Sequence, residues 1–182
     1  MSIVVLLTVM SFTSTEAQDA ELTKAAKVKA AFLYNFIKFV QWPSERSPAS
    51  TQQATICIVG NHPFGTALST LKTQLSGKMD VSIVMDAGQT SLSQCHVLFI
   101  GNGVADAMGD MLAAARKNNI LTVSENKDFA DKGGIIEMKT VEKSIGLFFS
   151  NKVNLRINMK AAETASLKIN PQLLEIAAEV IK

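Results

Sequence analysis

Four short apolar runs, separated by segments with helical periodicity, constrain the fold of this chain more than any other feature. The runs occupy residues 55–60, 81–85, 95–101 and 120–124. The third, CHVLFIG, is apolar almost throughout, which is typical of a strand that is covered on both faces. Residues 64–75 and 104–117 lie between runs and predict helices. This order predicts an α/β three-layer sandwich, with a mainly parallel sheet and helices on both faces.

The pattern changes after Gly133-Gly134, where the apolar runs become shorter. Three short strands are predicted at residues 135–138, 145–149 and 153–158. Polar pairs at Glu142-Lys143 and Asn151-Lys152 separate them and predict turns. We therefore expect an antiparallel extension of the sheet at its C-terminal side.

Helices are predicted at both ends of the strand-forming region. Residues 160–165 form a short helix, and residues 171–182 a final one with Pro171 in its first turn. Residues 24–40 form an amphipathic helix that ends before Pro43. Its apolar face is wide and aromatic, which favours burial in the core over a role for its lysines at a membrane surface.

The N-terminus predicts export. Residues 1–12 are uncharged and mostly apolar, too few to cross a bilayer but suited to the apolar region of a signal peptide cleaved after Ala17. No Lys or Arg precedes this run, and the alternative is an N-terminal strand or helix buried in the fold. Cleavage would leave residues 18–182 as a single periplasmic domain. Removing Glu16 leaves 18 basic and 15 acidic residues, a net charge of +3.

That small net charge, without a dense basic run, argues against nucleic acid as a partner. No apolar segment of about 20 residues follows residue 17, so we expect no membrane insertion of the mature chain.

The two cysteines, Cys57 and Cys95, form a candidate disulfide, because an even pair in an oxidising compartment usually bonds. Each lies at the start of a strand-like run, so neighbouring parallel strands could bring them within bonding distance. Two buried free thiols are the alternative at this stage.

No set of residues assembles into an active site. Gly101-Asn102-Gly103 precedes a helix as a dinucleotide-binding loop would, but Asp106 replaces the next required glycine. No nucleophile elbow is present, and Glu125 and Asp128 are typical of a solvated loop. We therefore predict that the protein is not an enzyme and needs no cofactor.

A metal site is also not predicted. The only cysteines and histidines of the chain, which could serve as zinc ligands, are Cys57, His62, Cys95 and His96. Because Cys95 and His96 are adjacent, their side chains would point to opposite faces of a strand.

A small-ligand site remains an alternative. The loops around Asn61-His62-Pro63, residues 101–103 and Glu125 follow strands of the predicted sheet. Parallel sheets bind ligands at that carboxyl edge, so a periplasmic sensory or transport-linked binding protein is the competing hypothesis.

Several blocks of the chain resemble the YfiR-like family. They are VKAAFLYNFIKFVQWP at residues 28–43, then ICIVG, CHVLFIG, LTVSENKDFADKGGIIEM at 121–138, and INMKAAETASLKINPQLLEIA at 157–177. The resemblance implies a periplasmic α/β domain that represses an inner-membrane diguanylate cyclase, or another membrane sensor, by binding its periplasmic part. It also matches the Cys57–Cys95 pair to a family disulfide. A homodimer remains open.

Candidate contacts with that partner lie in the C-terminal half. Phe148 and Phe149 are adjacent, so on a strand at least one of them needs cover other than a single core face. The family pattern has an acidic residue where this chain has Arg156, which implies a partner surface of different charge. We expect charge reversal at Arg156 to weaken the complex and leave the melting temperature nearly unchanged. The predicted contact residues are Phe148, Phe149, Leu155, Arg156 and Lys168.

Overall fold

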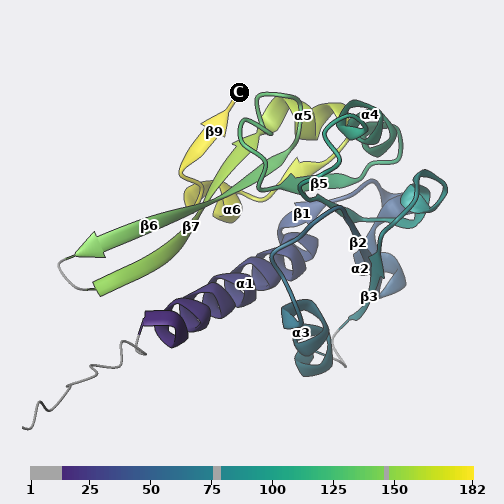
Figure 1. Cartoon of the computed structure of the whole chain (residues 1–182). Coiled ribbons are helices and arrows are strands. Elements are labelled where there is room, and N and C mark those ends of the chain that lie inside the picture. The colour runs from purple at the N-terminus through teal and green to yellow at the C-terminus, as the bar shows by residue number, and fades with distance from the viewer. Residues whose placement is uncertain (1–13, 76–78, 146–147) are drawn as a thin grey trace, which may run out of the picture.

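A seven-stranded mixed sheet organises the protein in a computed structural model that describes residues 14–75, 79–145 and 148–182 (Figure 1). The strand order is β3-β2-β4-β5-β6-β7-β9, and β1 and β8 form a separate two-stranded sheet. The strands are β1 Val40–Gln41, β2 Gln53–Val59, β3 Asp80–Met85, β4 Val97–Ile100, β5 Leu121–Ser124, β6 Ile136–Ile145, β7 Phe148–Asn158, β8 Lys168–Ile169 and β9 Glu179–Ile181. The helices are α1 Ser14–Phe39, α2 Pro48–Thr51, α3 Ala67–Leu75, α4 Met108–Lys117, α5 Met159–Thr164 and α6 Pro171–Glu175, with 3-10 turns η1 Ser44–Arg46 and η2 Gln89–Gln94.

The predicted parallel sheet is confirmed. Strand β2 pairs in parallel with both β3 and β4, β4 with β5, and β5 with the first residues of β6. The antiparallel extension is also present, because β7 runs antiparallel to β6 along its whole length.

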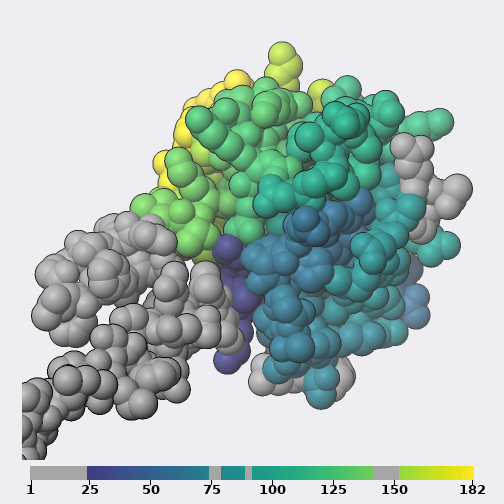
Figure 2. Space-filling model, viewed as in Figure 1, coloured from purple at the N-terminus to yellow at the C-terminus, as the bar shows by residue number. Residues whose placement is uncertain are grey.

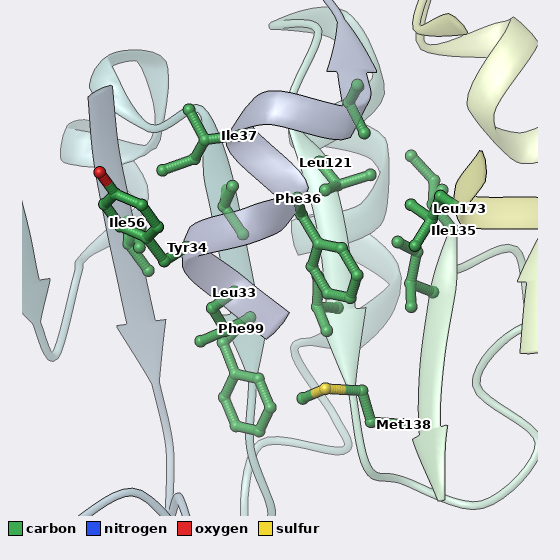
Figure 3. Close-up of a cluster of buried hydrophobic side chains, with 14 of the residues drawn as sticks. Leu33, Tyr34, Phe36, Ile37, Ile56, Phe99, Leu121, Ile135, Met138 and Leu173 are labelled. Carbon is green, nitrogen blue, oxygen red and sulfur yellow. The ribbon is translucent and has the colours of Figure 1, made fainter. Parts of the chain in front are cut away.

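Alternate residues of the central strands point into two separate cores, so helices cover both faces. On one face Leu33, Phe36 and Ile37 of α1 pack against strand residues such as Phe99 (Figure 3). On the other face α4 and η2 cover the remaining strand residues; this core includes Leu98, Ile100, Leu112 and Ala115. The predicted three-layer α/β sandwich is therefore confirmed.

The prediction of three short strands after Gly134 is wrong. The structure has two long strands, and Glu142 and Lys143 of the first expected turn pair with Asn151 and Ser150 across the hairpin. Polar residues did not mark chain reversals here, because an antiparallel ribbon can face water on one side.

The final helix is also shorter than predicted. Helix α6 ends at Glu175, and the chain then forms β9, which pairs in parallel with the root of β7. The amide of Ala178 donates to the carbonyl of Leu155. A sheet edge far away in sequence thus recruits residues whose local pattern predicts a helix.

Helix α1 begins ten residues before the predicted start, at Ser14, and so includes the predicted cleavage position Ala17. The apolar run at residues 1–12 lies outside the described residues. In the part of the chain that the structure describes, no helix is long and apolar enough to cross a membrane.

Candidate functional site

The outer part of the β6–β7 hairpin extends beyond the rest of the sheet, and we call it the ribbon. It comprises residues 138–145 and 148–155. Among the described residues, β5 pairs with this hairpin only at Ile136 and Glu137, and β9 pairs with it only at residues 156–158. Figure 1 shows the ribbon projecting from the sheet alongside the N-terminal half of α1. Two strands without further neighbours are marginal alone, so packing on α1 is needed to hold the ribbon.

The two faces of the ribbon differ. Met138 and Leu155 are buried on the face that belongs to the main core, Leu155 with 1% exposure. The expectation that Leu155 is a surface contact is therefore wrong. On the opposite face Lys139 and Lys152 are exposed, so the open side of the ribbon carries positive charge.

Phe148 and Phe149 lie at the far end of the ribbon, where their backbones pair with Ile145 and Ser144. Their side chains lie outside the described residues, and their proposed role in partner binding stays a prediction.

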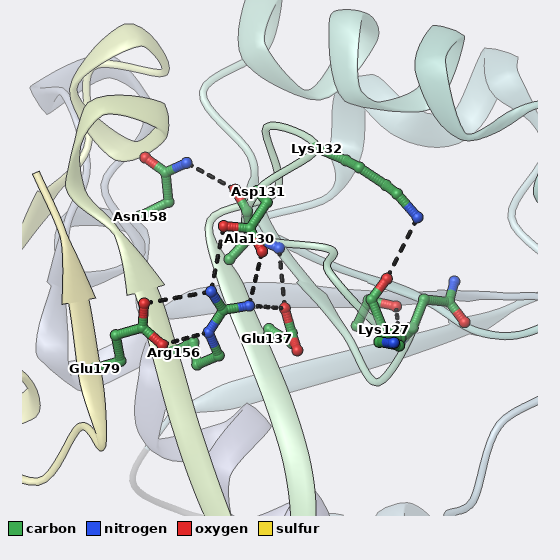
Figure 4. A network of polar contacts seen from close by, with 10 residues as sticks. Lys127, Ala130, Asp131, Lys132, Glu137, Arg156, Asn158 and Glu179 are labelled. Atoms are coloured by element: carbon green, nitrogen blue, oxygen red, sulfur yellow. Dashed lines mark hydrogen bonds and ion pairs between the residues drawn. The ribbon is translucent and has the colours of Figure 1, made fainter.

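Arg156 lies at the root of the ribbon, in the centre of three carboxylates (Figure 4). Its guanidinium reaches Asp131 at 2.9 Å, Glu137 at 2.9 Å and Glu179 at 2.7 Å. Glu137 also accepts from the amide of Ala130 at 3.2 Å and is almost fully buried. The cluster ties the 129–134 loop, β6, β7 and β9 together.

The electrostatics of this cluster follow from its geometry. Hydrogen bonds from Arg156 lower the pKa of both Asp131 and Glu179. The hydrogen bonds that Arg156 donates to Glu179 and Asp131 raise its own pKa in turn. Arg156 is therefore engaged within its own chain, and we now expect its charge reversal to reduce stability, contrary to the expectation from the sequence.

Lys168 is exposed, but it lies in β8 opposite Gln41, just beyond the C-terminal end of α1. The ribbon runs along the other half of that helix (Figure 1). The structure therefore does not bring Lys168 together with the ribbon.

The carboxyl edge of the sheet, the site of the competing ligand hypothesis, is closed by its own loops. The backbones of Asn61 and Asn102 bond to each other at 2.9 and 3.0 Å. This bridge requires glycine at position 101, because a Cβ there would lie 1.9 Å from the carbonyl oxygen of Asn61. Beside it, Glu125 forms an ion pair of 2.5 Å with the buried Lys29 of α1.

One pocket of about 300 Å³ lies next to this edge, between α1 and the loop that precedes α3. Lys27, Phe64, Thr66 and Thr70 contribute to its lining. The Nδ1 of His62 accepts a hydrogen bond from the amide of Phe64 at 3.4 Å, and the two rings stack.

Cys57 and Cys95 are joined by a disulfide with a Cα–Cα distance of 5.8 Å. Cys57 lies within β2, whereas Cys95 lies between η2 and β4, so neither begins a strand as expected. Both residues are fully buried. A reductant therefore cannot reach the bond unless the surrounding core opens, which favours a structural role.

His96, beside the disulfide, accepts a hydrogen bond at Nδ1 from the amide of Thr55 at 3.1 Å. Burial, followed by the nearby charge of Arg46, lowers its pKa. Among the described residues, no group of three or more His, Cys, Asp and Glu side chains is arranged to hold a metal ion.

The fold defines an α/β protein whose mainly parallel sheet is covered by helices on both faces. Residues 26–178 match the YfiR/HmsC-like family, and the chain belongs to it. Its members are periplasmic regulators in diguanylate cyclase signalling. No curated protein sequence matches the chain.

Solved structures share the fold at low identity. One is a conserved domain protein from Vibrio cholerae, with a TM-score of 0.57 and 14% identity over 85% of this chain. Another is an ABC domain in complex with L-Trp from Streptococcus pneumonia, with a TM-score of 0.52 and 10% identity over 86% of this chain. The chain spans 60% of the length of each of these structures.

Proposed function

We propose that the protein is exported to the periplasm and represses an inner-membrane diguanylate cyclase by binding its periplasmic part. Family membership supports the signalling role. The observation that carries the binding mode is the ribbon, which projects from a sheet whose other faces are covered by helices. A repressor works in this way if it binds the inactive conformation of its partner more tightly than the active one.

The ribbon offers two kinds of contact. Phe148 and Phe149 at its end are apolar anchors of the type that dominates interface energetics. Lys139 and Lys152 on the open face favour a partner surface with acidic residues. Lys168 would be a separate, peripheral contact.

A pull-down from detergent-solubilised inner membranes, using the tagged protein and mass spectrometry, tests this proposal. We expect a membrane protein with a periplasmic segment and a cytoplasmic cyclase domain. The double variant Lys139→Glu/Lys152→Glu should lose it, whereas Lys117→Glu on α4 should retain it. Recovery of the same membrane protein by all three forms would contradict binding through the ribbon.

Export is tested separately, by fractionating cells and measuring the intact mass of the periplasmic protein. Cleavage after Ala17 leaves a chain that begins at Gln18. A protein that keeps residues 1–17 and stays in the cytoplasm would overturn the proposal at its first step.

A small-ligand sensor is the second candidate, supported by the pocket beside Lys27. One structure of similar fold holds L-Trp, which makes amino acids the first compounds to try. A rise in melting temperature with L-Trp or another amino acid, abolished by Thr66→Phe in the pocket, would favour this candidate. The two functions are compatible, because a ligand could tune the repressor.

A further inference from the structure

The ring of His96 takes part in the hydrogen bonding of the main sheet. His96 lies just before β4, and its backbone amide donates to the carbonyl of Thr55 in β2 at 2.9 Å. The amide of Thr55 in turn donates to Nδ1 of the His96 ring at 3.1 Å. Because a backbone amide can only donate, Nδ1 carries no proton in this arrangement. The ring therefore completes the bonding of β2 only in its neutral form.

The segment packed on this ring comprises residues 42–47, and we call it the latch. The ring of Trp42 meets the ring of His96 edge-on, with 6.1 Å between the centroids. The guanidinium of Arg46 donates to two carbonyl groups within residues 93–95, at 2.9 and 2.5 Å. All three contacts end on the chain just before β4, so one short stretch holds the latch closed.

The closed latch leaves two buried donors without a partner. Nε1 of Trp42 and Nε of Arg46 are shielded from water, and no described residue accepts a hydrogen bond from either. A buried donor without an acceptor costs the free energy of its lost hydration. Opening would return both groups to water, so the contacts around His96 hold the closed form against this cost.

The charges around the ring oppose a proton on it. Burial and then the charge of Arg46 lower the pKa of His96, while a hydrogen bond with the backbone of Arg46 acts in the opposite direction. Glu45, the acidic residue of η1, is exposed and accepts from Ser44 instead. The sequences of β2, β4, β5, α2 and η2 contain no Asp, Glu, Lys or Arg, and the two cysteines are bonded to each other. These elements offer no carboxylate that could stabilise a charged imidazole.

A proton on Nδ1 would make this arrangement repulsive. The protonated nitrogen would face the amide of Thr55 donor to donor, and the imidazolium would lie beside the guanidinium of Arg46. Burial adds the cost of desolvating the new charge. The ring must then turn away from β2, and its contact with Trp42 is lost.

We propose that His96 is an acid sensor, whose protonation opens the latch and brings Trp42 and Arg46 into water. The open form solvates the ring and returns its pKa toward the ordinary value of 6.5. The closed form has the lower pKa and binds fewer protons, so it is favoured above that value. Acid shifts the latch toward the open form as the pH falls from 6.5 through the lowered pKa, and the shift is complete below it.

The change should be confined to the latch, because α1 is held independently. Leu33, Phe36 and Ile37 of this helix are buried in the main core. In the space-filling view only a narrow strip of α1, in purple, is visible beside the blue residues of α3 (Figure 2). Opening therefore does not require the helix to leave the sheet.

An acid sensor suits a periplasmic protein, since protons cross the outer membrane through its pores and the pH inside follows that of the medium. This use rests on the proposed export. The latch itself is a property of the folded chain alone.

Fluorescence tests the proposal directly, because Trp42 is the only tryptophan of the chain. Acrylamide is a neutral quencher that must touch the indole ring. Between about pH 7.5 and about pH 4.5 we expect a several-fold rise in the acrylamide quenching constant and a red shift of the emission. The midpoint should lie below 6.5, and far-UV circular dichroism should stay unchanged over the range.

Two variants assign the response to one ring. His96→Gln keeps a hydrogen-bond acceptor but cannot take up a proton, so its quenching constant should not depend on pH. His62→Gln is the matched control, because His62 is the only other histidine of the chain. This variant should keep the full pH response.

Amide hydrogen exchange of the unmodified protein gives a readout that needs no substitution. The amide of Thr55 should be protected at about pH 7.5 and lose most of its protection factor at about pH 4.5, whereas amides in the middle of β4 keep theirs. A Thr55 amide that stays protected throughout would contradict the opening.

The proposal is overturned if Trp42 stays inaccessible to acrylamide at every pH at which the fold is retained. Weaker fluorescence without access for acrylamide would also overturn it, because the ring would then be protonated without opening the latch. An equal pH response in His96→Gln would exclude His96 as the sensor. All these measurements use the purified protein alone, so failure of the proposed membrane partner would leave them unaffected.

Discussion

The parallel strands β2, β4 and β5 and the β6–β7 ribbon bury their side chains in different ways. Every residue of β4 and β5 is buried, because helices cover both faces of the sheet there. In the ribbon, Met138 and Leu155 are buried while Lys139 and Lys152 are exposed. One region is a closed core, and the other has one packed face and one free face.

Because of this difference, we assign stability mainly to the parallel strands and partner recognition mainly to the ribbon. Residues with no solvent exposure contribute mainly by packing, and the region built on β2, β4 and β5, which we call the parallel half, holds many of them, including Phe99. A ribbon that packs on one side only has a lower local stability and a surface that a partner can use. We therefore expect the two regions to respond differently to substitution.

The largest effect should come from Phe99→Ala in β4. Phe99 is fully buried and packs edge-to-face on Phe64 at 4.7 Å between ring centroids. The cavity should reduce the free energy of unfolding by about 3–5 kcal/mol in urea titrations. Val141→Ala in the half-buried ribbon should cost below about 1 kcal/mol. Similar losses of unfolding free energy for the two variants would contradict the difference between the parallel strands and the ribbon.

The second largest effect should come from removing the disulfide, because it links β2 covalently to the residues just before β4. Cys57→Ala/Cys95→Ala opens a loop with a sequence separation of 38 residues. We expect a loss of about 2–4 kcal/mol in the free energy of unfolding. Thiol trapping of the native protein with reductant should show no free cysteine until denaturant is added. Rapid reduction of the folded protein would instead favour a redox-sensing bond.

Arg156→Met should cost about 1–3 kcal/mol, because it leaves Glu137 buried with fewer partners. The double variant Arg156→Met/Glu137→Gln should recover part of that loss, which a double-mutant cycle measures. If Arg156→Met leaves the melting temperature unchanged but weakens partner binding, Arg156 is a partner contact, as the sequence predicted.

The smallest effect should be a pH dependence at the same cluster. The pKa values of Asp131 and Glu179 are lowered in the folded protein from ordinary values of 3.8 and 4.5. Their contribution is therefore fully present above those values, and it is lost as the pH falls through the lowered pKa values. Melting temperatures between about pH 2 and pH 5 should fall less steeply for Arg156→Met than for the unmodified protein. Parallel profiles would mean that the two carboxylates contribute nothing through Arg156.

Much of the parallel half could be predicted from local sequence. The run CHVLFIG predicts a strand covered on both faces, and β4 is fully buried. The face of α1 with Phe32 and Phe36 predicts a core helix, and Phe36 is fully buried. Periodicity suffices here because each element buries one continuous set of its own residues.

The candidate site was harder to predict. The alternation of Val153, Leu155 and Ile157 with polar residues indicates one buried strand face, yet Leu155 was expected at the surface. Nothing in the sequence indicates that Glu137 lies opposite Arg156. That pairing depends on the register of the hairpin, and a shift of one residue would turn every side chain to the other face.

The amino-acid sequence by itself determined the α/β class, the covered parallel strands and the cysteine pair, because short-range patterns encode which faces are buried. Only the tertiary structure decided the length of the ribbon, the strand at the C-terminus and the closure of the carboxyl edge by Asn61 and Asn102. Each of these depends on backbone hydrogen bonds between segments that are distant in sequence. Such bonds use amides and carbonyls that every residue carries, so no side-chain pattern announces them.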